Sequence, residues 1–433
     1  MPYDGWVPEA GAVVPVEPAS LDAQTMWTKY IRCRRPVVLD GLLDDVAWKG
    51  NQWTDMSYLR RKAGEAEVMV EPVHPKEQCF GTNMQREPMK LRELLDKLHD
   101  PEQEGQFYLT TQYEADTDDA VSVATDEGPG LDPVLPSPTH QLRDDFPLHP
   151  RLLGDLVLQQ CNLWIGSGTK QRSSGLHHDF HDNLYLLLQG HKRFVLFPPS
   201  AHEHLFVRGH LTNVHPNGLL VYGDDSIRPD GLDELDAAHW RVVARAKRAA
   251  KKRRTDKGND AYAEAKQAWQ RLRQERGEGQ AEEEEEDDDD EEDDDNDDDA
   301  LGILDGGAES ESECDMDEGE ALLAALDEPP SFSRIKTHKL HAHFGIQPAI
   351  EAPPNATSDL VPAPPCSAPL VVELHAGQML YLPASWFHEV TSWASESGPH
   401  MAFNYWMHPP DGHAKAYKDT EVWEAIRERV ESL

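Results

Sequence analysis

A long charged interval divides this chain into two stretches of similar character. Between about residues 225 and 338 the apolar pattern gives way to a basic run, Arg241–Arg276. An acidic tract follows at residues 281–299, where 17 residues are Asp or Glu. Runs of like charge cannot bury a core and remain solvated. We therefore interpret the interval as an insertion, partly helical in its first half and disordered in its second.

Short apolar runs of strand length flank this insertion on both sides and predict β-structure. They are rich in β-branched and aromatic residues and are separated by glycine or proline. Because a surface loop accepts a long insertion at little entropic cost, the runs favour one mainly β domain, an antiparallel barrel or sandwich. The runs are Phe107–Gln112, Leu156–Ile165, Asn183–Leu188, Lys192–Phe197, Pro369–Leu374, Met379–Leu382, Phe387–Thr391 and Met401–Trp406.

Helices are expected at the edges of this domain. Residues 21–32 predict a helix that leads into a strand at Pro36–Gly41, and four leucines between residues 91 and 98 share one helical face. A last helix has an apolar stripe that fits packing on the domain itself or a homodimer contact. The stripe consists of Val422, Ile426, Val430 and Leu433.

These patterns give four segments. Residues 1–20 are expected to be a disordered N-terminus, and residues 21–224 the first part of the β domain. Residues 225–338 form the charged insertion. Residues 339–433 complete the β domain and end in the C-terminal helix.

Composition limits the partners and the compartment. The net charge of −39 disfavours direct binding to nucleic acid or to an anionic membrane, because like charges repel. The five cysteines contain no C-x-x-C pair, and no run of 18 apolar residues or signal-like leader is present. We expect a protein of the cytoplasm or the nucleus, with Lys251–Arg254 as a candidate nuclear-localisation patch. The acidic tract is a candidate site for basic proteins, or a solubilising linker.

Three residues offer the ligands of a metal site. His177 and Asp179 form an H-x-D pair, and alternation along a strand would point both side chains to the same face. His388, from a distant strand, adds a second imidazole. Two imidazoles and one carboxylate make up the facial triad that holds Fe(II) in non-haem oxygenases and leaves positions open.

A cation and two hydroxyls accompany these candidate ligands. Lys192 lies in an otherwise apolar strand pair, where it is either an outward surface residue or an inward one that needs an anion. Ser174 and Tyr108 taken singly are an ordinary turn serine and strand tyrosine. Together, the three residues supply what the distal carboxylate of a dicarboxylic acid requires.

Several motifs resemble the core of JmjC-domain 2-oxoglutarate oxygenases, in the right order, over about residues 25–225 and 335–433. The similarity is greatest to the small hydroxylases, which include the asparaginyl hydroxylase of hypoxia-inducible factor and small JmjC lysyl hydroxylases. This resemblance implies a double-stranded β-helix of the jelly-roll or cupin type. The motifs are Asn162–Gly166, Ser174–Asp179, Asn183–Tyr185, Gly190–Arg193, Phe197–Pro199, Ala376–His388 and Phe403–Trp406.

The resemblance also implies roles for individual residues. His177, Asp179 and His388 would bind Fe(II), and Lys192 would pair with the far carboxylate of 2-oxoglutarate. Ser174, where relatives have threonine, and Tyr108 would assist Lys192. Asn183 and Asn404 fall at amide positions that line the site.

The implied activity is hydroxylation of a side chain in a protein substrate. Dioxygen and 2-oxoglutarate would be consumed, with succinate and CO2 as co-products. Two alternatives remain: an N-methyl-lysine demethylase, which would release formaldehyde, and a non-catalytic cupin that binds a partner.

Overall fold

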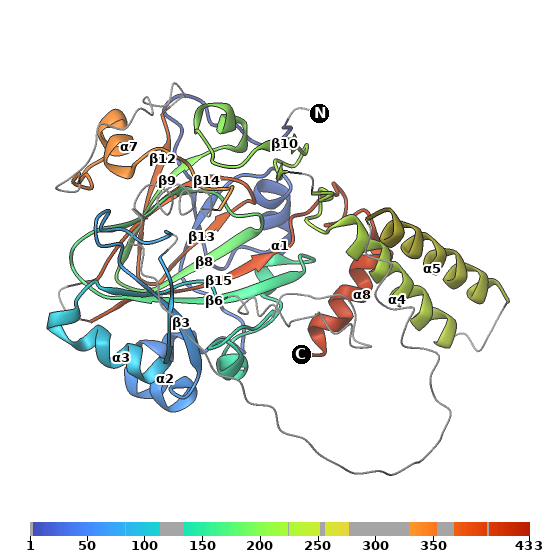
Figure 1. Ribbon diagram of the computed structural model, residues 1–433, viewed down its shortest axis with the longest axis horizontal. Coiled ribbons are helices and arrows are strands. Elements are labelled where there is room, and N and C mark those ends of the chain that lie inside the picture. Colours follow the sequence, from blue (N-terminus) through green and yellow to red (C-terminus); the bar gives the residue numbers. More distant parts are fainter. Residues whose placement is uncertain are drawn as a thin grey trace, which may run out of the picture.

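Two β-sheets form the centre of the protein, and helices cover their outer surfaces (Figure 1). The computed structural model describes residues 3–82, 84–112, 134–223, 225–251, 256–276, 329–352, 368–395 and 398–433. Within these residues the architecture is a mainly β jelly roll with flanking helices, as the sequence predicted.

Strands from before and after the insertion alternate in both sheets. The larger sheet contains β1 (Val16–Pro18), β2 (Val37–Asp40), β3 (Glu67–Pro72), β4 (Glu87–Lys90), β5 (Phe107–Leu109), β6 (Leu158–Gly166), β8 (Asp182–Gln189), β13 (Gln378–Leu382) and β15 (His400–Met407). The smaller sheet contains β7 (Arg172–His177), β9 (His191–Phe197), β12 (Leu370–His375) and β14 (Phe387–Trp393). A separate pair is formed by β10 (Leu211–Val214) and β11 (Leu220–Tyr222).

The strand order shows that the two halves of the chain build one domain. The larger sheet runs β1-β2-β13-β8-β15-β6-β5-β3-β4, and the smaller runs β12-β9-β14-β7. Thus β8 lies between the late strands β13 and β15, and β14 lies between the early strands β9 and β7. β1 and β2 are parallel, whereas the other paired strands are antiparallel.

The central strands are apolar on both faces because both faces are covered. On β8, Leu184 and Leu186 belong to the cluster that packs against helices, whereas Tyr185 and Leu187 belong to the cluster between the two sheets. A third cluster covers the outer face of the smaller sheet, where Phe197 and other residues meet the helix at residues 337–344. Burial on both sides explains why the sequence shows continuous apolar runs rather than strict alternation.

Helices lie around the sheets in three groups (Figure 1). α1 (Ala23–Met26), α2 (Met56–Ala63) and α3 (Leu91–His99) pack on the larger sheet, and α7 (Thr337–Phe344) packs on the smaller one. α4 (Glu234–Lys251), α5 (Asp256–Arg276) and α8 (Thr420–Glu431) gather beyond one end of the sheets. The predicted apolar face of α3 is confirmed, because its four leucines are all buried.

The N-terminus differs from the expectation of disorder. Residues 3–20 lie against the β domain: β1 pairs with β2, and the ring of Trp6 stacks on the ring of Trp386 at 5.9 Å. The guanidinium of Arg35 also lies over the Trp6 ring, 4.8 Å from its centroid. The prediction for this segment was wrong because a proline-rich sequence without a periodic apolar pattern does not reveal an aromatic residue that packs against a partner far away in the chain.

The basic part of the insertion folds back onto the C-terminal helix. Val422, Ile426 and Val430 of α8 are buried, and α4 packs against α8. Ion pairs join the two helices, so part of the basic charge is neutralised within the chain. These pairs are Arg241–Asp419, Arg245–Glu421, Lys247–Glu428, Arg248–Glu421 and Arg248–Glu424.

The structure bears on only part of the remaining predictions for the insertion. The acidic tract and the side chains of Lys251–Arg254 lie outside the described residues. Residues 329–338, within the range predicted as insertion, lie along β7, where Phe332 forms a β-bridge with His177. The end of this interval therefore belongs to the surroundings of the candidate site.

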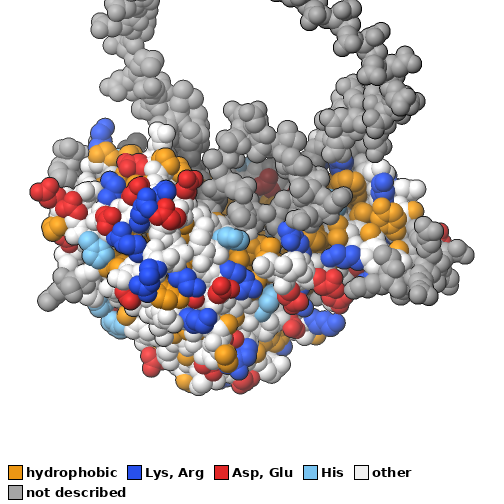
Figure 2. All heavy atoms as spheres, turned by 90° about the horizontal axis from the view of Figure 1, so that it is seen from below, with side chains coloured by type: hydrophobic (Ala, Val, Ile, Leu, Met, Phe, Trp, Pro, Cys, Tyr) orange, Lys and Arg blue, Asp and Glu red, His pale blue; other side chains and the backbone are white. Residues whose placement is uncertain are grey.

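Basic and acidic side chains are interspersed on the face that carries α2 and α3, as Figure 2 shows from below. Arg60 pairs with Asp96, and Glu65 pairs with both Lys90 and Arg92. Such exposed pairs leave no large uniform field on this face. No helix among the described residues has the length and hydropathy needed to cross a bilayer.

Candidate metal centre

Strand pairing brings the three candidate metal ligands together. His177 ends β7 and is the direct cross-strand partner of His388, the second residue of β14. Asp179 lies just beyond β7, in a loop held by a hydrogen bond from the Ser385 amide to its carbonyl oxygen, at 2.7 Å. The ligand atoms of His177, Asp179 and His388 all lie within 4.8 Å of one another. Asp179 reaches this position through the loop, not through strand alternation as the sequence analysis assumed.

Backbone carbonyl groups fix the orientation of both imidazoles. His177 Nδ1 lies 3.0 Å from the Gly175 carbonyl oxygen, and His388 Nδ1 lies 2.9 Å from the Trp386 carbonyl oxygen. A carbonyl oxygen only accepts, so Nδ1 carries the proton in each ring. The lone pair is therefore on Nε2 in both rings, which is the arrangement that metal-binding histidines adopt.

Burial also keeps the first imidazole neutral. Burial, with a smaller effect from His388, lowers the pKa of His177 to about 4, although Asp179 acts in the opposite direction. A neutral imidazole is the form that binds a metal ion. Two such nitrogens and the Asp179 carboxylate match the donor set of non-haem ferrous sites. Within the described residues, this is the single cluster of such ligands.

A cavity of about 580 Å³ adjoins the three ligands. Its wall includes Asn183, Tyr108 and Ser174, as well as the apolar side chains of Phe80 and Phe194. The combination of apolar walls with few polar groups is typical of small-molecule sites.

Lys192 is fully buried and lies behind Tyr108 and Ser392, which line this cavity. Its ammonium donates hydrogen bonds to the Tyr108 hydroxyl at 2.9 Å and to the Ser392 hydroxyl at 2.6 Å. In the described part of the chain no carboxylate pairs with it, and burial lowers its pKa from 10.5 to about 7. The sequence left open whether Lys192 points outward or inward; the structure places it inward.

Ser174 and Asn183 line the same cavity, and Asn404 lies behind Asn183. Asn404 donates from Nδ2 to Asn183 Oδ1 at 3.0 Å, and its own Oδ1 accepts from Trp164 Nε1 at 2.8 Å. The Ser174 hydroxyl accepts from the Val390 amide at 3.2 Å. No hydrogen bond joins Ser174 to Lys192 in the residues that the structure describes.

Several cavity residues escaped the sequence analysis, among them Ser392, Arg172, Tyr185 and His400. Ser392 shares a face of β14 with His388 because it lies four residues further along, so alternation from the ligand could have indicated it. His400 is buried, and burial followed by the charge of Lys192 lowers its pKa well below 6.5. Tyr185 lies within the Asn183–Tyr185 motif, whereas no local signal in the sequence marks His400.

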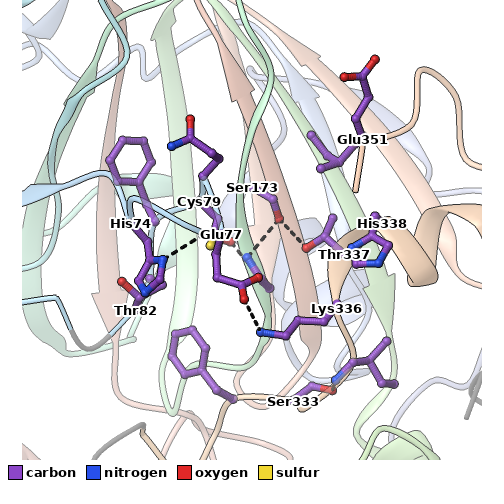
Figure 3. A pocket seen from close by; sticks show the side chains of 18 of the residues that line it. His74, Glu77, Cys79, Thr82, Ser173, Ser333, Lys336, Thr337, His338 and Glu351 are labelled. Carbon is purple, nitrogen blue, oxygen red and sulfur yellow. Dashed lines mark hydrogen bonds and ion pairs between the residues drawn. The ribbon is translucent and has the colours of Figure 1, made fainter. Parts of the chain in front are cut away.

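An outer pocket continues from the cavity and is shown in Figure 3. It shares Phe80, Ser173 and Ser174 with the metal cavity. One wall is the loop at residues 74–82 and the other is the segment at residues 332–338. The ion pair between Glu77 and Lys336, at 3.4 Å, joins the two walls.

Buried polar networks support the strands that carry the ligands. Glu389, next to His388 but on the outer face of β14, accepts from the Ser173 hydroxyl at 2.6 Å and lies 3.1 Å from His341 Nε2 of α7. Asp182, three residues after Asp179, forms a bidentate pair with Arg34 and accepts from the Tyr381 hydroxyl at 2.6 Å. Both networks are almost completely shielded from solvent.

Burial of Lys192 predicts a link between pH and stability. The folded protein has a Lys192 pKa of about 7 against 10.5 as the ordinary value, so the unfolded chain binds more protons between these pH values. The contribution of Lys192 to the free energy of unfolding therefore rises with pH across this window. The free energy of unfolding of wild type minus that of Lys192→Met should grow by a few kcal/mol from about pH 7 to about pH 10. Urea titrations without ligand measure this difference, and a difference independent of pH would contradict the assignment.

A jelly roll with a His-Asp-His centre is the arrangement of a cupin-type metal-binding protein. Comparison with known proteins agrees with this class, because a model of the cupin-like domain matches residues 23–413. The chain is also 37% identical to JmjC domain-containing protein 4 of Schizosaccharomyces pombe, over 99% of this chain and 92% of that protein. The protein therefore belongs to the JmjC-domain family of cupin-type proteins, a family of iron- and 2-oxoglutarate-dependent oxygenases.

A second similarity is more limited. The chain is 28% identical to tRNA wybutosine-synthesizing protein 4 of Neurospora crassa, over 45% of this chain and 15% of that protein. This match is confined to a small part of a much longer protein.

Proposed function

We propose that this protein is an Fe(II)- and 2-oxoglutarate-dependent dioxygenase that hydroxylates a side chain of a protein substrate. The observation that carries the proposal is one cavity lined by the His-Asp-His ligand set and by two hydroxyls that contact a buried, unneutralised lysine. Iron bound by these ligands would supply the activation of dioxygen, with 2-oxoglutarate converted to succinate and CO2 as a C–H bond becomes C–OH.

Lys192, Tyr108 and Ser392 would hold the distal carboxylate of 2-oxoglutarate. The two hydroxyls already contact the ammonium group, so the three groups converge on one position before any ligand binds. A carboxylate there would neutralise a buried cation, which is unfavourable when unpaired. Such a pair also orients the opposite end of the co-substrate towards His177, Asp179 and His388.

The amide pair provides a second orienting group. Trp164 Nε1 donates a hydrogen bond to Asn404 Oδ1, and Asn404 Nδ2 donates one to Asn183 Oδ1. The amino group of Asn183 is thereby left to donate to a ligand. Around it, Tyr185, Phe194 and Val390 form apolar walls that keep bulk water from the reacting groups.

The outer pocket supports a macromolecular substrate. It opens to the surface and is continuous in its lining with the metal cavity. A side chain that projects from a protein partner could occupy it and approach the centre. The tRNA-related similarity gives less support to a nucleic-acid substrate, because the net charge of −39 opposes binding to a polyanion.

Three assays on the purified full-length chain test the proposal. Conversion of 2-oxoglutarate to succinate in the presence of Fe(II) distinguishes an oxygenase from a non-catalytic binding protein. A gain of one oxygen atom on captured protein partners, detected by mass spectrometry, supports hydroxylation. Release of formaldehyde would instead support an N-methyl-lysine demethylase. Failure to bind or turn over 2-oxoglutarate would refute the oxygenase assignment.

Replacement of Lys192 is expected to weaken the binding of 2-oxoglutarate more than it slows the reaction at saturating co-substrate. In Lys192→Met the KM for 2-oxoglutarate should rise roughly 10- to 100-fold, because a charge-assisted hydrogen bond contributes about 1.5–3 kcal/mol. kcat at saturating co-substrate should fall less. An unchanged KM would remove Lys192 from the co-substrate site.

A further inference from the structure

Arg172, Ser392 and Lys192 lie in one row across three neighbouring strands. Ser392 of β14 is the direct partner of Arg172 on β7 and of Lys192 on β9. Side chains of directly paired residues project from the same face of a sheet. Lys192 and Ser392 meet between the sheets, so Arg172 also projects from the inner face and lines the metal cavity.

The charge of Arg172 is not neutralised by the described residues. Its side chain is 8% exposed, and Nη1 donates to the backbone oxygen and to Oε1 of Gln78, both at 3.0 Å. Its Nε has no hydrogen-bond partner, and neither Arg172 nor Lys192 has a carboxylate within ion-pair distance in the described part of the chain. Buried cations normally occur with a counter-charge. Arg172 therefore adds an uncompensated positive charge to the lining of this cavity, and Lys192 lies on the other side of Ser392 in the same row.

We propose that Arg172 is a second cationic residue for the distal carboxylate of the co-substrate, and that it sets the preference of the site for a dicarboxylate. This inference rests on the proposed function, since it assigns a residue to the same cavity. Lys192 provides the direct contact, and Arg172 adds charge and the unpaired Nε–H donor. A guanidinium remains charged when buried, whereas an ammonium readily loses its proton, so Arg172 secures the positive charge of the site.

Arg172 also connects the cavity with the outer pocket. Gln78, whose two oxygens accept from Arg172, belongs to the loop that forms one wall of that pocket. The loop also carries Phe80, which lines both spaces. A carboxylate that binds next to Arg172 would therefore also lie close to the loop that forms one wall of the outer pocket.

Binding of two matched ligands tests the role of Arg172. The ligands are 2-oxoglutarate and 2-oxopentanoate, in which a methyl group replaces the distal carboxylate. Dissociation constants are measured by calorimetry on full-length protein loaded with Mn²⁺ without oxygen. In Arg172→Gln, we expect 2-oxoglutarate binding to weaken about tenfold or more and 2-oxopentanoate binding to change less than about twofold. Arg172→Lys, which keeps a cation, should retain part of the preference.

Arg193→Gln is the matched control. Arg193 is equally buried and lies next to Lys192, but it projects from the other face of β9, where it donates to Thr391 and to the Pro348 carbonyl oxygen. This variant should leave the ratio of the two dissociation constants unchanged. An unchanged ratio in Arg172→Gln, or an equal change in Arg193→Gln, would overturn the inference. Failure of the wild-type protein to bind 2-oxoglutarate would instead overturn the proposed function together with it.

Discussion

Replacing His177 or Asp179 with alanine is expected to reduce 2-oxoglutarate turnover to the background rate and to remove iron from the purified protein. The two remaining donors cannot fix a ferrous ion in one geometry. The loss of metal affinity and of turnover should therefore exceed the roughly 10- to 100-fold loss caused by removing a residue that only hydrogen-bonds to a metal ligand. Metal analysis of folded protein and succinate formation provide two independent measurements.

His178→Gln is the matched control for these variants. His178 adjoins His177 in sequence but turns away from the centre, and its Nε2 lies 2.7 Å from the Tyr222 hydroxyl. The substitution should lower stability because it alters a buried hydrogen bond, while bound iron remains near the wild-type amount. Full iron content and turnover in both His177→Ala and Asp179→Ala would exclude the ligand assignment.

Arg34→Ala is expected to lower the free energy of unfolding by about 3–5 kcal/mol. Arg34 is 3% exposed and forms a bidentate ion pair with the fully buried Asp182, at 2.8 and 2.6 Å. Removal of the guanidinium leaves a carboxylate unpaired inside the protein, next to the loop that carries Asp179. Urea unfolding of the metal-free protein measures the loss.

An exposed ion pair supplies the comparison for Arg34. Lys29 pairs with Glu17 at 3.4 Å, and its side chain is 57% exposed. Lys29→Ala should therefore change the free energy of unfolding by less than about 1 kcal/mol. Equal shifts of the urea midpoint in the two variants would show that the buried pair has no special role in stability.

The parts of the fold that could be predicted are those with a local sequence pattern of their own. The central strands, such as β8, are apolar on both faces because each face is covered, and this produces runs of recognisable length. α3 was predictable because its leucines repeat at helical spacing. The packing of the segment around Trp6 against the β domain was not predictable, since it depends on a contact with Trp386, far away in the chain.

The candidate site likewise contains residues that the sequence indicated and residues that it did not. The H-x-D spacing and the motif resemblance indicated His177, Asp179 and His388, although Asp179 lies in a loop rather than on the strand. Arg172 required the pairing of β7 with β14, in which the register shifts by one residue between the Glu389 and Thr391 pairs because β7 carries an extra residue there. Such a shift reverses the face of the β7 side chains beyond it, so spacing from His177 alone could not place Arg172.

The position of β14 also has a consequence for the order in which the protein forms during synthesis. β14 lies between β9 and β7, so β7 lacks a neighbour in its sheet until residues 387–393 have left the ribosome. The contact between His177 and His388 joins segments 211 residues apart, and contacts of such high order form late. A metal ion bound by both histidines would therefore enter only after residues 387–393 have left the ribosome, and it would then link the segments before and after the insertion.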